Sequence, residues 1–413
     1  MRVCSYARRL AIAVCATGAL MIAAPSGQAS TRPPLSVGAA ILVAPATRQE
    51  LYGVDYNRRV AIASTTKLMT ALVTLEHVHH LSTVFTAPNY YAASVDSQVG
   101  LVPGERMSVH DLLLALLIPS ADDAAVDLGY NVGHGSVGRF VAMMNAEARA
   151  LGLRHTHYST PSGLDTPGNY STAADLVKLA SYDMSHSAYF ARVVGLRSAV
   201  LRSGNHVRYV VNRNDLVGEV PWIDGIKTGH TADAGYVLVA SGHRNGMTLI
   251  SAVLGTASEG ERDANTLALL DYGFKNFHPV TPIAAGHVMA RPTVRDRPGF
   301  RAAVVAGGTF TRVLARHDRV RVVVRMPSQL VGPLRRHAQV GTAVVLADGR
   351  PIAHVPLLLA RALPAVSGLT IAARFISKPL MLLIIVGVLA ALLALVVARR
   401  RRSRATSGDL EAA

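Results

Sequence analysis

The chain has 413 residues, half of them apolar and only 16% charged, which excludes an intrinsically disordered protein. Aromatic residues make up 5%, too few for a surface that stacks single-stranded nucleic acid. The only cysteines are Cys4 and Cys15, so the body of the chain has no disulfide scaffold and no cysteine-ligated metal site.

The formal net charge is +16, and part of it lies at the two ends. Without the terminal arginines and acids, 34 basic residues remain against 24 acidic ones, a net charge of +10. These arginines look scattered along the sequence rather than clustered. The charge therefore predicts attraction to an anionic surface such as a cell envelope, and no nucleic-acid partner.

Residues 1–29 have the pattern of a signal peptide. Arg2, Arg8 and Arg9 precede an apolar run over residues 10–24, and the small residues Gly27 and Ala29 suit cleavage after position 29. The arginine pair leaves both general secretory export and twin-arginine export open.

The pattern of residues 36–275 predicts an α+β domain with helices against an antiparallel sheet. A hairpin is expected over 36–54, and Ser64 opens an apolar helical period. Ser108 and Asp111 form a capping-box signature before the helix at 112–118. The further expected elements are helices near 122, 137–151, 172–182 and 259–274, and strands from 223 with a hairpin over 236–254.

The composition changes after residue 277. Residues 281–360 are rich in valine, with short strand-like stretches and turn signals, and they predict a small β-rich domain. Residues 361–378 are expected to form a linker.

Residues 379–398 form an uncharged run of 20 residues. A helix of that length spans about 30 Å, the thickness of a bilayer core. Four arginines, 399–402, follow at once, as in a stop-transfer signal. We expect a single transmembrane helix, an extracytoplasmic body and a short cytoplasmic tail over 399–413. The alternative is a buried core helix.

Three short motifs carry the chemistry. In Ser64-Thr65-Thr66-Lys67, a helical spacing of three places the lysine amine beside the serine hydroxyl, which needs a base to become nucleophilic. Ser120-Ala121-Asp122 lies at the break between two helices. Lys227-Thr228-Gly229, followed by His230, ends an apolar strand, where lysine and threonine can bind a carboxylate and glycine permits close approach.

In this order, the motifs resemble those of the penicillin-recognising serine enzymes, and most closely the D-alanyl-D-alanine carboxypeptidases. The segments 118–125, 162–165, 170–176 and 224–231 are similar to stretches of that family. The resemblance covers about residues 36–275. It implies a β-lactamase/transpeptidase-like domain, and it covers residues 281–360 only as an expected β-rich second domain ahead of the predicted transmembrane helix.

The resemblance also implies roles for individual residues. Ser64 would attack the bond between two D-alanines of a peptidoglycan stem peptide, Lys67 would take its proton, and Ser120 would relay a proton to the leaving D-alanine. Lys227 and Thr228 would bind the terminal carboxylate, and the N–H groups of Ser64 and His230 would form an oxyanion hole. Water would release the acyl group without a cofactor or metal, and β-lactams would acylate Ser64.

Asp122 departs from the family pattern, which has asparagine at this position. An ionised aspartate only accepts hydrogen bonds, and its charge favours a protonated Lys67. Three possibilities stay open: Asp122 is tolerated with an altered rate, its side chain points elsewhere, or Asp123 changes the local geometry.

Three other functions are compatible with parts of the pattern. A class A β-lactamase lacks support because no E-x-x-L-N stretch lies between Ser120 and Lys227; Glu147 is followed by Ala-Arg-Ala. A related peptidoglycan hydrolase or transpeptidase, and a membrane-tethered protein that binds stem peptides without turnover, remain alternatives. None of the 16 histidines lies in a zinc-hydrolase motif, so no metal site is expected.

Overall fold

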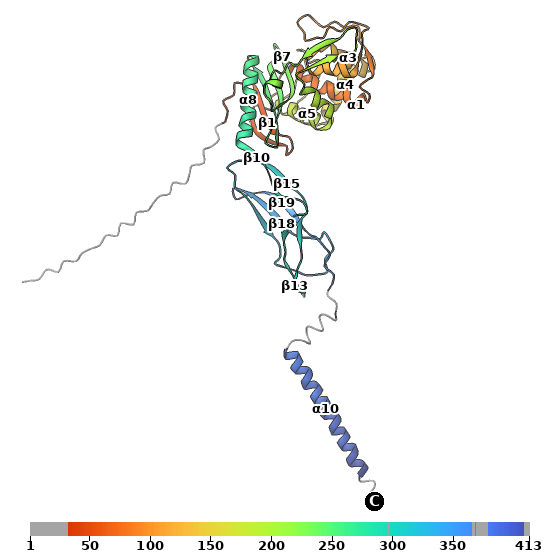
Figure 1. The fold of residues 1–413 in the computed structure, drawn as a ribbon, viewed down its shortest axis with the longest axis vertical. Coiled ribbons are helices and arrows are strands. Elements are labelled where there is room, and N and C mark those ends of the chain that lie inside the picture. The colour runs from red at the N-terminus through yellow and green to blue at the C-terminus, as the bar shows by residue number, and fades with distance from the viewer. Residues whose placement is uncertain (1–31, 296, 366–367, 369–378, 409–413) are drawn as a thin grey trace, which may run out of the picture.

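The structure of the protein is a computed structural model that describes residues 32–295, 297–365, 368 and 379–408 (Figure 1). The expected signal peptide, residues 1–29, lies outside the described residues. So do most of the expected linker and the last five residues of the expected tail.

The first domain is built on a five-stranded antiparallel sheet in the order β2-β1-β9-β8-β7. Both expected hairpins are present, the first as β1 and β2, the second as β8 and β9 joined at Asn245 and Gly246. The strands are β1 (Ala39–Ala44), β2 (Gln49–Val54), β7 (Ile223–Thr231), β8 (Gly235–Arg244) and β9 (Met247–Thr256).

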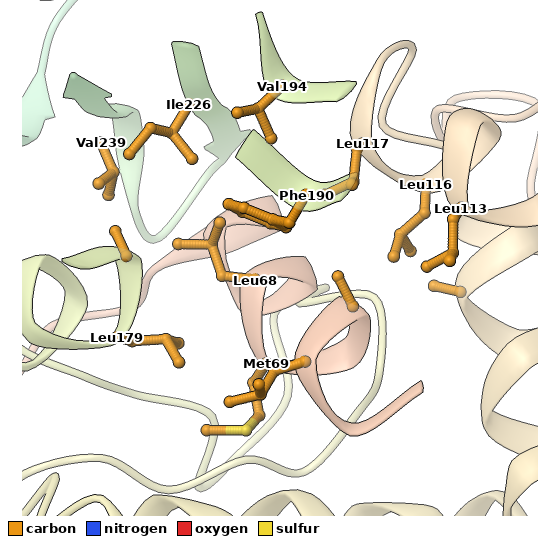
Figure 2. Close-up of a cluster of buried hydrophobic side chains, with 14 of the residues drawn as sticks. Leu68, Met69, Leu113, Leu116, Leu117, Leu179, Phe190, Val194, Ile226 and Val239 are labelled. Carbon is orange, nitrogen blue, oxygen red and sulfur yellow. The ribbon is translucent and has the colours of Figure 1, made fainter. Parts of the chain in front are cut away.

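Side chains alternate across this sheet and build a core on each face, because successive residues of a strand point to opposite sides. Ile41 and Val239 join the core under the main group of helices, whereas their neighbours Leu42 and Leu238 join the core under α8 (Glu259–Asn276). In Figure 2, residues from α1, α2, α5, α6 and β7 meet in the first core. The expected α+β class with helices against an antiparallel sheet is confirmed.

Several helices begin at side-chain caps, of which the sequence predicted the one at Ser108. Ser108 Oγ accepts from Asp111 N at 3.2 Å, as the capping-box signature predicts. Thr172, Ser136 and Ser258 cap three further helices in the same way. The helices are α1 (Lys67–His77), α2 (Val109–Leu117), α3 (Asp122–Val132), α4 (Val137–Ala150), α5 (Ala173–His186), α6 (Ala188–Val194) and the short α7 (Leu216–Glu219).

Two short hairpins were not expected from the sequence. They are β3 (Val84–Thr86) with β4 (Arg106–Ser108), and β5 (Ser198–Leu201) with β6 (Arg208–Val211). Strands of three or four residues show too little alternation to be recognised, and long-range contacts hold them. Arg208 of β6, for example, pairs with Glu105 at 2.9 Å.

Residues 277–359 form a β-rich region with three sheets around their own core. The largest has the order β11-β14-β19-β18-β16, another pairs β10 with β15, and the third has the order β13-β12-β17. The strands are β10 (Phe277–Ile283), β11 (Val288–Ala290), β12 (Thr293–Val294), β13 (Arg297–Arg301), β14 (Val304–Ala306), β15 (Phe310–Ala315), β16 (Val320–Arg325), β17 (Gln329–Leu330), β18 (Gln339–Ala347) and β19 (Arg350–Leu359).

The two regions are joined without a loop, since α8 ends at Asn276 and β10 begins at Phe277. The side-chain amide of Gln49 on β2 adds two hydrogen bonds across the junction. Its Nε2 donates to Val313 O at 2.9 Å, and its Oε1 accepts from Val313 N at 2.7 Å. Val313 also belongs to the core under α8, so this core continues into the β-rich region.

The last described element, α10 (Pro379–Gly408), continues beyond the expected end at residue 398. Residues Leu382–Arg401 have a mean hydropathy of 2.8, and none of this stretch is buried against the rest of the protein. The alternative of a buried core helix is therefore wrong. This helix is a candidate membrane anchor by its length and composition.

Candidate active site

Ser64 lies in a single 3-10 turn, η1 (Ala63–Thr66), that leads directly into α1. The lysine amine lies beside the serine hydroxyl, as expected, because Lys67 Nζ donates to Ser64 Oγ at 2.9 Å. The turn is held from outside by Gly163, which has a φ of +92°. A Cβ at this position would clash with the carbonyl oxygen of Ala63, so glycine allows the loop to pass closely over η1.

Lys67 is fully buried and all its N–H groups have acceptors. Besides Ser64 Oγ, Nζ donates to Asp122 Oδ1 at 2.6 Å and to Ser162 O at 2.8 Å. Burial lowers the pKa of Lys67 because it penalises the charged amine, while the carboxylate of Asp122 opposes this shift. Burial is the larger effect, so the neutral amine that a general base requires is easier to reach than in an exposed lysine.

Asp122 is the first residue of α3, and its carboxylate faces Lys67. The possibility that Asp122 points elsewhere is thus wrong. Asp123 turns away from the site, and its carboxylate accepts from Val99 N at 3.1 Å and Leu101 N at 2.9 Å. Burial raises the pKa of Asp122, and the nearby ammonium of Lys67 opposes that rise.

Ser120 occupies the break between α2 and α3 with a φ of +68°. Its hydroxyl oxygen is buried and has no hydrogen-bond partner among the described residues. A non-glycine residue with positive φ and an unpaired buried hydroxyl is unusual in a structural cap. The hydroxyl is therefore free to bond to a molecule in the cleft, which Ser120 lines.

The third motif lies on the edge strand β7. Gly229 is required here, because a Cβ would come within 2.9 Å of Ser64 N. Thr228, Gly229 and His230 line the cleft, and the His230 ring stacks on Tyr236 with centroids 4.0 Å apart. Lys227 is buried behind this wall, with Nζ donating to Thr228 O at 3.1 Å. Burial, reinforced by the charge of Lys67, holds the pKa of Lys227 well below its usual range.

The motifs thus meet around one cleft of about 490 Å³, lined by Ser64, Ser120 and Asp122 on one side and by Thr228, Gly229 and His230 on the other. The structure adds charged residues that the sequence did not identify: Asp96, Arg213, Glu259 and Arg262. Arg262 is buried and pairs with Glu259 at 2.9 Å and Asp263 at 2.8 Å. No local motif marks these residues, since distant segments bring them to the cleft.

A serine hydroxyl in contact with a buried lysine, next to a free second serine and a strand-borne Lys-Thr-Gly, defines a serine hydrolase that works through acyl transfer. The profile of the D-alanyl-D-alanine carboxypeptidase family, peptidase family S11, matches residues 26–258. The chain belongs to this family, and it is a serine-type D-Ala-D-Ala carboxypeptidase. Penicillin binding is typical of the family.

The relatives extend the similarity beyond this domain. The chain is 28% identical over 326 residues to the D-alanyl-D-alanine carboxypeptidase DacF of Bacillus subtilis, covering 77% of this chain and 83% of the relative. It is 30% identical over 341 residues to DacD of Salmonella typhimurium, covering 79% and 86%.

Solved structures share the fold. Penicillin binding protein 5 from Haemophilus influenzae superposes with a TM-score of 0.67 at 27% identity, covering 81% of this chain and 99% of that one. The Streptomyces K15 DD-transpeptidase has a TM-score of 0.57 at 32% identity, covering 59% and 99%.

Proposed function

We propose that this carboxypeptidase removes the terminal D-alanine from peptidoglycan stem peptides through an acyl-enzyme on Ser64. The observation that carries the proposal is the 2.9 Å contact between Ser64 Oγ and the buried amine of Lys67. A neutral amine has two N–H donors, which suffice for Asp122 and Ser162 O. Its lone pair then faces the Ser64 hydroxyl and can take the proton as Oγ bonds to the carbonyl carbon.

The same cleft supplies the remaining roles. Lys227 and Thr228 bind the terminal carboxylate, with Gly229 giving β7 its close approach. The N–H groups of Ser64 and His230 stabilise the negative charge on the carbonyl oxygen. When the peptide C–N bond breaks, Ser120 passes a proton from Lys67 to the leaving D-alanine. Water then hydrolyses the ester on Ser64. Asp122 holds the Lys67 amine in place.

The chain organisation supports a location at the cell membrane. We propose that the signal peptide, 1–29, directs export of the catalytic domain, 36–275, and the β-rich domain, 281–360. A linker, 361–378, leads to the anchor at 379–398, which crosses the membrane once and leaves 399–413 in the cytoplasm. Protease added to intact spheroplasts should then digest the body and spare a tag at residue 413.

Intact-mass measurement after penicillin treatment tests the nucleophile. We expect one adduct, mapped to the peptide that contains Ser64, and none in Ser64→Ala. Ser97→Ala is the matched control, since Ser97 lines the same cleft without contacting Lys67 and should still be labelled. Labelling that persists in Ser64→Ala would refute the assignment.

Turnover needs a separate measurement. The enzyme should release D-alanine from a pentapeptide that ends in D-Ala-D-Ala, and Ser64→Ala should not. A penicillin adduct without D-alanine release at any pH would instead indicate a stem-peptide binding protein.

A further inference from the structure

Charge is divided unevenly between the two domains. Residues 36–275 hold 18 basic and 21 acidic residues, a net charge of −3. Residues 281–360 hold 12 arginines and 3 aspartates, a net charge of +9. The arginines that look scattered along the sequence therefore concentrate in the β-rich domain. Among its described residues, none of these arginines forms an ion pair with a carboxylate.

Exposed apolar side chains accompany the arginines at one end of this domain. The three-stranded sheet β13-β12-β17 carries Phe300, which is 46% exposed. Val331, directly after β17, is 51% exposed. Two exposed arginines accompany them: Arg301 at the end of β13, and Arg295 in the turn that joins β12 to β13. We call Arg295, Arg297, Phe300, Arg301 and Val331 the basic tip. An aromatic side chain among arginines that have no carboxylate partner is typical of protein surfaces at a membrane interface.

The basic tip lies where the chain leaves the domain. Arg297 Nη2 donates to Pro364 O at 3.1 Å, and Leu363 pairs with Leu334 just beyond β17. Figure 1 shows β13 at the end of the β-rich region that is opposite to the catalytic domain. From Pro364, 15 residues lead to the start of α10 at Pro379. A chain of this length spans at most about 50 Å, so the tip lies within about that distance of any membrane that holds α10 and can reach its surface.

We propose that the basic tip rests on an anionic lipid surface, with Phe300 entering the headgroup layer and Arg295 and Arg301 binding lipid phosphates. The proposal rests on the proposed membrane anchoring by α10. Charge complementarity favours acidic lipids, because the attraction of each arginine adds to that of the others within a Debye length of the surface. The nearly neutral catalytic domain has no such attraction, so the β-rich domain faces the membrane and the catalytic domain points away from it.

A fluorescent probe at position 300 tests this contact. Because Cys4 and Cys15 are the only cysteines, the full chain with Cys4→Ser and Cys15→Ser accepts a single environment-sensitive label at Phe300→Cys. The label at Tyr209→Cys is the control, since Tyr209 is an aromatic residue of the catalytic domain and is 82% exposed. Each protein is reconstituted into vesicles of phosphatidylcholine alone or with about a third phosphatidylglycerol. Nitroxide-labelled lipid quenches any probe that enters the headgroup layer.

We expect quenching at position 300 to rise about twofold in the acidic vesicles and to fall again at high salt, with no change at position 209. Arg295→Gln with Arg301→Gln should abolish the rise. Arg319→Gln with Arg350→Gln removes the same charge elsewhere, since Arg350 lies at the end of β19 away from the chain exit, and should preserve it.

Vesicle flotation separates the two hypotheses. A chain that floats with both lipids but shows equal quenching at positions 300 and 209 would overturn the tip contact alone. Equal quenching at position 300 in neutral and acidic vesicles would overturn the role of the arginines. A chain that does not float would overturn the anchor and, with it, this proposal. Penicillin labelling of every variant confirms that the catalytic domain is folded.

Discussion

Lys67 Nζ and Asp122 Oδ1 lie 2.6 Å apart at a position where both side chains are buried. The carboxylate holds the amine beside Ser64, but its charge also favours the protonated amine, which cannot act as a base. Burial works in the opposite direction and is the larger effect on the pKa of Lys67. In the proposed mechanism, burial thus lets Lys67 serve as the base in spite of the aspartate.

Replacement of this aspartate by asparagine tests the balance between burial and the charge of Asp122 in setting the pKa of Lys67. An asparagine oxygen still accepts from Lys67 but carries no charge, so the Asp122→Asn variant should lower the pKa of Lys67 further. Because the neutral amine is the active form, the acidic limb of the acylation profile should move to lower pH, with an equal or higher rate at neutral pH. Penicillin acylation rates measured across pH check this. A sharp loss at every pH would mean that the carboxylate has a role of its own.

The proposed role of Lys227 should have a pH dependence opposite to that of Lys67. In the proposed function its ammonium form binds the substrate carboxylate, and burial holds its pKa well below the usual range, so binding should weaken as the pH rises through that lowered value. We expect KM to increase at alkaline pH and the kcat/KM profile to be bell-shaped. Lys227→Gln should raise KM about tenfold or more, as for loss of a charge-assisted hydrogen bond. The exposed Lys275→Gln is the control, and an unchanged KM in Lys227→Gln would contradict the assignment.

Gly229 sets the distance between β7 and the nucleophile. In Gly229→Ala the new Cβ would lie 2.9 Å from Ser64 N and 3.0 Å from Ala63 Cβ, so one of these elements must move. Misplacement of a reacting group by about 1 Å can cost a hundredfold in rate, and we expect penicillin acylation to slow by about that factor. Gly260→Ala, where a Cβ meets no atom within 4 Å, should leave the rate unchanged. Normal acylation in Gly229→Ala would show that this approach is not needed.

Asp183 on α5 gives a prediction about stability. It is fully buried, and neither carboxylate oxygen has a hydrogen-bond partner among the described residues. Burial raises its pKa well above the ordinary 3.8, so the folded protein keeps the proton to a higher pH than the unfolded chain does. The free energy of unfolding therefore falls as the pH rises from the unfolded value towards the folded one.

Asp183→Asn removes this titration. Relative to the parent protein, the variant should gain thermal stability as the pH rises above the ordinary 3.8, so its advantage should be larger at an alkaline than at an acidic pH. Differential scanning calorimetry at the two pH values measures the difference, with the exposed Asp55→Asn as control. A gain that is equal at both values would show that the carboxyl group of Asp183 does not titrate on unfolding.

The sequence predicted the parts of the site that depend on local spacing. Ser64 and Lys67 contact each other because three residues make one helical turn, and Ser108 caps α2 because the cap is a local motif. The sequence did not identify Arg213 or Arg262, since β6, α7 and α8 bring them to the cleft through long-range packing. It left three possibilities open for Asp122, namely that it is tolerated with an altered rate, that it points elsewhere or that Asp123 changes the local geometry, because the outcome depends on which carboxylate lies beside Lys67.

The two hydrogen bonds between Gln49 and Val313 affect how the active-site cleft can be placed relative to the β-rich region. Together with the direct passage from α8 into β10, they restrain the β-rich region against the catalytic domain. In the proposed membrane-anchored enzyme, the cleft would therefore be carried by the β-rich region, and the 15 residues from Pro364 to the start of α10 would limit how far both can stand from the lipid.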